Sequence, residues 1–139
     1  MKSVFFYGLF MDDDLLKEKG LNPSNPKLAH VAGYGLRIGE RATLESSAEE
    51  RAFGSIMDLS GEELESLYGE KSVADYAPKQ MIAIDMQGNS REVTSYILPT
   101  EKVSGSNSEY ARLLAVAARK VGLPDAYIDE IETWIQTDA

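Results

Sequence analysis

Apolar and polar positions divide the first quarter of the chain into a strand, a helix and a loop. A run of apolar, aromatic and β-branched residues from Val4 to Met11 predicts a strand. The aspartates at 12–14 then supply a capping side chain and early negative charge for a helix over about Asp13–Lys19. Two prolines in the stretch Leu21–Pro26 remove backbone donors, so this stretch is predicted to be a loop.

Strand-like patterns recur in the middle of the chain. The stretches Leu28–Ile38 and Ala52–Leu59 predict strands, and the polar stretch Glu45–Arg51 between them predicts an exposed loop. The segment Ser60–Glu63 has the S-x-x-E spacing of a capping box. A short helix should therefore follow and end near Gly69.

The second half predicts a hairpin and two helices. Lys79–Asp85 and Glu92–Leu98 read as strands joined by a turn in which Gly88 takes the positive φ angle. Apolar residues at spacings of three and four predict a helix from a Ser108 cap to Gly122. Pro124 suits the first turn of a last helix, because its missing donor costs nothing there.

This order of elements predicts a mixed α+β domain. Most connections are too short for crossovers between parallel strands. A small, closed or nearly closed β-barrel, mixed but largely antiparallel and flanked by helices, therefore fits better than a doubly wound sheet. No repeat or linker divides the chain, and residues 1–139 are predicted to form a single domain.

Composition narrows the classes of function. With 23 acidic and 14 basic residues, the net charge of −9 argues against a nucleic-acid or anionic-membrane partner. The absence of cysteine excludes thiolate catalysis and Cys-based metal sites, and the single histidine, His30, is interpreted as structural or surface-exposed. No apolar run approaches the roughly 20 residues of a membrane span, and the N-terminus lacks the features of a signal peptide. A cytoplasmic protein is expected.

The most informative stretch for function is Tyr7–Phe10. A strand that ends in Tyr7-Gly8 and turns directly into a helix brings backbone N–H groups to one point, where they can bind a carboxylate or another anion. The alternative reading is a buried strand with a tight exit turn. Local chemistry alone leaves both readings open.

Four passages together resemble the γ-glutamylcyclotransferase family, which includes AIG2-like proteins and γ-glutamylamine cyclotransferases. They are similar to the family's N-terminal Tyr-Gly loop, its V-x-G-x-x-[YW]-x-[LM] strand, its tyrosine-bearing later strand and its C-terminal tyrosine helix with a G-L-P turn. In this sequence they are Tyr7–Met11, Ala52–Leu59, Ser95-Tyr96 and Ser108–Tyr127. They span nearly the whole chain in the family's order.

The resemblance implies a six-stranded closed barrel with a pocket for a γ-glutamyl group. The substrate's own α-amine attacks its γ-carbonyl and releases 5-oxoproline and a free amine or amino acid. This chemistry needs positioning and one carboxylate, with no metal or cofactor. The substrate-binding residues implied are Tyr7, Gly8, Leu9, Phe10, Tyr76, Tyr96 and Tyr110.

The chain departs from the family pattern at the catalytic glutamate. In the spelling L-x-x-[LM]-E-G, Leu64–Gly69 matches with Tyr68 at the glutamate position. In the spelling L-D-x-x-E-G, Lys71 falls there and Glu70 lies one residue short. Phenol and ammonium groups are not bases at neutral pH without a large shift in pKa. Either Glu70 is the catalytic acid/base or the site has lost its base.

Two hypotheses follow from the sequence. The first is a γ-glutamylcyclotransferase-type enzyme with Glu70 as its acid/base and a small γ-glutamyl compound as its substrate. The second keeps the barrel and pocket but makes the protein a non-catalytic binder of a small amino-acid-like ligand or a regulatory protein. If Glu70 is dispensable, Asp75 and Glu40 are the next acids to test.

Overall fold

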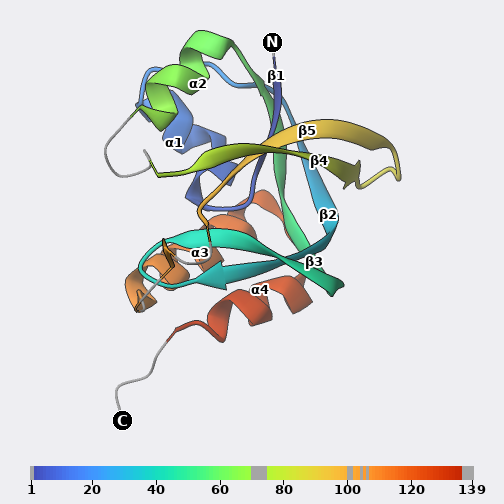
Figure 1. Cartoon of the computed structure of the whole chain (residues 1–139), viewed down its shortest axis with the longest axis vertical. Coiled ribbons are helices and arrows are strands. Elements are labelled where there is room, and N and C mark those ends of the chain that lie inside the picture. The colour runs from blue at the N-terminus through green and yellow to red at the C-terminus, as the bar shows by residue number, and fades with distance from the viewer. Residues whose placement is uncertain (1, 70–74, 100–101, 104, 106, 136–139) are drawn as a thin grey trace.

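The computed structural model describes residues 2–69, 75–99, 102–103, 105 and 107–135. Strands and helices alternate irregularly along the chain, as expected for an α+β domain (Figure 1). In chain order the elements are β1 (Lys2–Phe6), η1 (Leu9–Met11), α1 (Asp13–Glu18), β2 (Ser24–Ile38), β3 (Ala42–Leu59), α2 (Gly61–Tyr68), β4 (Ala77–Asp85), β5 (Ser90–Ile97), α3 (Ser108–Val121) and α4 (Asp125–Glu132).

The strands form a closed barrel in the order β1-β3-β2-β4-β5. Antiparallel pairing joins consecutive strands of this order, and one parallel bridge between Val4 of β1 and Thr94 of β5 closes it. The predicted mixed, largely antiparallel barrel is therefore confirmed. In Figure 1, α1 and α2 lie toward one end of the molecule and α3 and α4 toward the other. The described barrel has five strands, so the count of six is corrected.

The polar stretch Glu45–Arg51 is strand, which corrects the predicted loop. It belongs to β3, and Glu45, Ser46 and Arg51 pair with β2 in a two-stranded ribbon that has a register shift after Ala32. Two of its acidic side chains pair with Arg37, whose Nε donates to Glu45 Oε2 at 2.8 Å and whose Nη2 donates to Glu50 Oε2 at 2.8 Å. A strand that is exposed to water on both faces has no buried face and needs no alternation of apolar and polar residues. The hydrophobic pattern therefore did not predict this strand.

Three predicted boundaries are also corrected. The first strand ends at Phe6, and Leu9–Met11 form a 3-10 turn in which the Met11 N–H donates to the Gly8 carbonyl at 3.0 Å. Strand β2 begins at Ser24 within the expected loop, because a register shift accommodates Pro26. Asn107, rather than Ser108, caps α3 by accepting from the Tyr110 N–H at 2.9 Å.

The helix cap, hairpin turn and helix stop that the sequence predicts elsewhere are present in the structure. Ser60 and Glu63 form the capping box of α2, with N–H to oxygen distances of 3.0 and 3.1 Å. Gly88 at the tip of the β4–β5 hairpin and Gly122 at the end of α3 adopt φ angles of 85° and 92°. These values lie in the left-handed region, which favours glycine.

The core fills the barrel and the space between the barrel and α3. Val4, Phe5 and Phe6 of β1 are almost completely buried, as are Ala111 and Leu114 of α3. Helix α3 also packs on α4 and on the 3-10 turn after β1. The exit of β1 is thereby held against a helix from the other end of the chain. Among the described helices, none has the length and apolar character needed to cross a bilayer.

Candidate functional site

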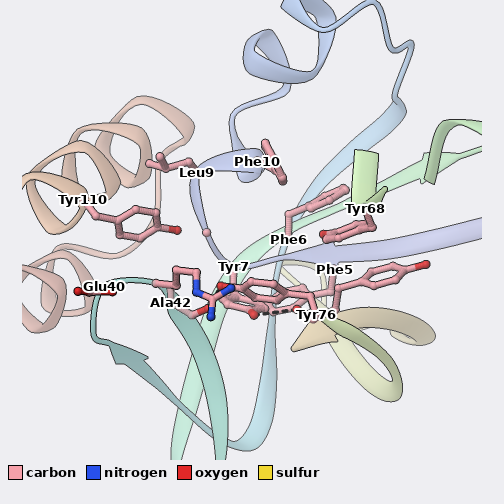
Figure 2. A pocket seen from close by; sticks show the side chains of 13 residues that line it. Phe5, Phe6, Tyr7, Leu9, Phe10, Glu40, Ala42, Tyr68, Tyr76 and Tyr110 are labelled. Carbon is pink, nitrogen blue, oxygen red and sulfur yellow. Dashed lines mark hydrogen bonds between the residues drawn. The ribbon is translucent and has the colours of Figure 1, made fainter. Parts of the chain in front are cut away.

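One cavity of about 260 Å³ opens at the end of β1 (Figure 2). Its described wall is mainly aromatic and comes from separate parts of the fold: the end and exit of β1, η1, the β2–β3 turn, the end of α2, the residue before β4, and the elements β5 and α3. The lining residues are Phe5, Phe6, Tyr7, Gly8, Leu9, Phe10, Glu40, Arg41, Ala42, Tyr68, Tyr76, Tyr96 and Tyr110.

The turn after β1 lines this cavity with Gly8, Leu9 and Phe10. Within the described residues, the N–H groups of Gly8 and Phe10 donate to no backbone acceptor. Figure 2 shows Tyr110 reaching from its helix toward the segment that carries Leu9. A Cβ atom at Gly8 would lie 2.7 Å from the Tyr110 hydroxyl oxygen, so glycine allows this close approach. Two N–H groups without a backbone acceptor among the described residues therefore lie close to a phenol.

Hydrogen bonds and stacking fix the phenol rings. The Tyr7 hydroxyl donates to the Tyr96 carbonyl at 2.7 Å, and the Tyr76 hydroxyl donates to the Ala42 carbonyl. The rings of Tyr68 and Tyr96 stack with centroids 3.8 Å apart and planes 13° apart. Few side chains need to be ordered when a ligand enters, because the wall is already organised.

The phenols in the cavity are neutral at physiological pH. Burial raises the pKa of Tyr7, Tyr68 and Tyr110 above the ordinary value, and neighbouring phenols raise it further. Burial also raises the pKa of Tyr76, an effect that the Arg41 guanidinium opposes. These groups are consequently hydrogen-bond donors and acceptors rather than bases at pH 7.

The raised pKa values predict delayed ionisation of tyrosines in the folded protein. Free phenols ionise near pH ~10, so the unfolded chain releases these protons first and the folded state loses stability as the pH rises above that value. Ultraviolet titration of tyrosinate should show at least three of the seven tyrosines titrating only on unfolding. A single transition of all seven near pH 10 with the fold intact would contradict this burial.

Two charged residues in the described part of the chain line the cavity, both from the β2–β3 turn. Glu40 is the carboxylate among the described lining residues, and its backbone carbonyl accepts from Asn107 Nδ2 at 3.2 Å. Arg41 Nη1 donates to Asp75 Oδ2 at 3.2 Å, and Lys102 Nζ lies 3.7 Å from Asp75 Oδ1. The described residues thus place an acidic and a basic group at this cavity.

The structure brings together all of the predicted substrate-binding residues. The four residues of the Tyr7–Phe10 turn, Tyr76, Tyr96 and Tyr110 line this cavity, and their role in binding stays a prediction. Glu70 lies outside the described residues. The predicted set omitted Phe5, Phe6, Glu40, Arg41, Ala42 and Tyr68. Of these, Tyr68 carried a signal in the sequence, its place immediately before Gly69, and Glu40 was named there only as an alternative acid.

Three aspartates outside the cavity, at positions 12–14, bring carboxylate oxygens within 4.8 Å of one another. Lys120 Nζ lies 2.9 Å from Asp12 Oδ2 and 2.8 Å from Asp14 Oδ2, so this cluster already has a cationic partner. Asp12 also caps α1 by accepting from the Asp14 N–H. The cluster therefore has a structural explanation.

Solved structures show what the fold is similar to. An uncharacterized protein from Homo sapiens matches with a TM-score of 0.79 and 17% identity, covering 99% of this chain and 90% of that one. A gamma-glutamyl cyclotransferase matches with a TM-score of 0.79 and 16% identity over the same shares. A gamma-glutamyl cyclotransferase specific to glutathione from yeast matches with a TM-score of 0.65 and 13% identity, covering 96% and 95%.

No protein-family model and no curated protein sequence matches the chain. At the identities found, the structural likeness establishes the fold, which is that of γ-glutamyl cyclotransferases and related proteins. The expectation drawn from four sequence passages is thereby confirmed for the fold.

Proposed function

We propose that this chain, which has the γ-glutamyl cyclotransferase fold, releases 5-oxoproline and a free amine or amino acid from a small γ-glutamyl compound. The observation that carries the proposal is the convergence of the Tyr7–Phe10 turn, Tyr76, Tyr96 and Tyr110 on one aromatic cavity. Such a cavity, apolar with a few placed polar groups, is typical of small-molecule sites. We propose the cytoplasm as its compartment.

In the proposed complex, the α-carboxylate of the γ-glutamyl group binds at the exit of β1. The Gly8 and Phe10 N–H groups there have no backbone acceptor within the described residues, and N–H groups at a helical turn favour an anion. The neutral Tyr110 hydroxyl, beside Gly8, adds a polar contact for the bound group. The aromatic wall excludes water from the methylene carbons.

The proposed reaction is an intramolecular acyl transfer. The α-amine attacks the γ-carbonyl, a bond forms between this nitrogen and the carbonyl carbon, and the bond to the leaving amine breaks. Glu70 takes one proton from the ammonium group before the attack and passes it to the leaving nitrogen. The ring nitrogen gives up a second proton after the attack, which the released amine takes, so the protons balance. A rigid cavity accelerates such a step by holding the two ends of one molecule together.

A second candidate function is ligand binding without turnover. The presence of Tyr68 in the cavity supports it. In the spelling L-x-x-[LM]-E-G this residue stands at the glutamate position, and it lines the cavity. Burial raises the pKa of its hydroxyl, so Tyr68 is protonated at neutral pH and cannot accept a proton. The same cavity would then bind a small amino-acid-like ligand and leave it unchanged.

A panel of γ-glutamyl amino acids and γ-glutamyl amines distinguishes the two candidates. The wild-type protein is incubated with each compound, 5-oxoproline is quantified, and binding is measured by calorimetry on the same samples. Release of 5-oxoproline from at least one compound is expected. Binding without release of 5-oxoproline across the panel would overturn the proposed enzyme activity and support the ligand-binding function. Absence of both would overturn both candidates.

A further inference from the structure

Arg41 is the basic residue among the described residues that line the cavity. Its side chain is 35% exposed, so it lies at the edge of the cavity rather than deep within the aromatic wall. The Arg41 guanidinium opposes the effect of burial on the pKa of Tyr76, which indicates that the cation lies near this phenol. A fixed positive charge therefore stands beside neutral rings.

The guanidinium of Arg41 retains donors for a ligand. It carries five N–H donors in a planar fork. Among the described residues, its hydrogen bond uses one nitrogen, Nη1, which donates to Asp75 Oδ2 at 3.2 Å. The Asp75 side chain is half-exposed and also lies close to Lys102. It therefore orients the Arg41 guanidinium while leaving the other guanidinium nitrogens accessible. A carboxylate that enters the cavity edge can bind the remaining N–H groups in the bidentate manner typical of arginine.

The neighbouring carboxylate does not neutralise this fork. The Glu40 side chain lies over Gly105, where an added Cβ would be 3.1 Å from Glu40 Cγ and 3.4 Å from Oε1. The ion pair of Arg41 is made with Asp75 instead. The side chains of Glu40 and Arg41 thus lie beside different residues, Gly105 and Asp75, although the two are adjacent in the chain.

We propose that Arg41 determines substrate class by binding a carboxylate on the leaving group, so that γ-glutamyl amino acids are preferred over γ-glutamyl amines. This inference rests on the proposed function, in which the α-carboxylate of the γ-glutamyl group occupies the Tyr7–Phe10 turn. The second carboxylate of a γ-glutamyl amino acid then reaches the cavity edge. A γ-glutamyl amine has no group for Arg41 to bind.

The test compares two compounds that differ in this carboxylate alone, γ-glutamylalanine and γ-glutamylethylamide. Their Kd values are measured by calorimetry with the wild-type protein and with Arg41→Gln. We expect the wild type to bind γ-glutamylalanine about tenfold more tightly, since a charge-assisted pair at a partly exposed site contributes on this scale. Arg41→Gln should abolish that ratio while Kd for γ-glutamylethylamide stays unchanged, which also reports that the variant is folded.

Arg37→Gln is the matched control. Arg37 is an arginine of the neighbouring β2 strand that pairs with Glu45 and Glu50 and does not line the cavity, so its replacement should leave the ratio intact. If wild type binds both compounds equally, or if Arg41→Gln weakens both by the same factor, the inference fails and the proposed function stands. If wild type binds neither, the proposed function fails as well.

Discussion

Replacement of Glu70 by glutamine is expected to reduce 5-oxoproline release by about 100-fold or more, with ligand binding nearly unchanged. Glutamine keeps the shape and polarity of glutamate but cannot accept the ammonium proton. Positioning by the described aromatic lining would persist, because the substitution changes none of those residues. The measurement is steady-state turnover of the best compound in the panel, with Kd measured separately by calorimetry.

Glu40→Gln is the matched control for this prediction. Glu40 is the cavity carboxylate among the described residues, and the same substitution there tests whether any acid near the substrate would serve. Turnover should remain within a few-fold of wild type in Glu40→Gln. A large loss in Glu40→Gln together with an active Glu70→Gln would identify Glu40 as the base. If wild type binds without turnover and Tyr68→Glu gains it, the chain has lost the family's base at position 68.

Gly54→Ala is expected to destabilise the protein by about 3 kcal/mol or more, because it forces atoms together in a filled barrel. A Cβ atom at Gly54 of β3 would lie 2.1 Å from the carbonyl oxygen of Phe6 and 2.9 Å from its carbonyl carbon. Both are backbone atoms of β1, which pairs with β3 and cannot move without breaking that pairing. Thermal unfolding should show Tm lowered by roughly 10 °C.

Gly61→Ala provides the control for this substitution. Gly61 is the first residue of α2, and an added Cβ there meets no atom within 4 Å. Alanine should stabilise this helix by about 0.5–1 kcal/mol, since it restricts the unfolded chain and suits a helix. Unchanged Tm in Gly54→Ala, alongside the expected increase in Gly61→Ala, would contradict the close approach of the two strands.

The elements that followed from the sequence are those whose signals are local. The Ser60–Glu63 capping box, the hairpin at Gly88 and the stop at Gly122 each depend on groups a few residues apart, and each is present in the structure. The errors came where local signals are ambiguous. The stretch Glu45–Arg51 looked like a loop because its strand is exposed, and the 3-10 turn after Phe6 continued the apolar run of β1.

The candidate site was predictable only in part, for a similar reason. The Tyr7–Phe10 turn, Tyr76, Tyr96 and Tyr110 could be named because they match short motifs of a family whose fold the chain shares. Glu40 and Arg41 match no motif and sit in an ordinary turn between strands. Glu40 was named from the sequence only as an alternative acid, and the position of the turn at the cavity edge is what makes Arg41 a candidate.

The sequence by itself determined the order of most strands and helices, the turns between them and the class of fold. Periodicity and capping act over one or two turns of the chain, so they can be read without coordinates. The composition of the cavity was decided by tertiary structure, because its walls meet through contacts such as that of Tyr7 with Tyr96, 89 residues apart. Closure of the barrel makes these residues neighbours, and no local pattern encodes which side chains that closure will bring face to face.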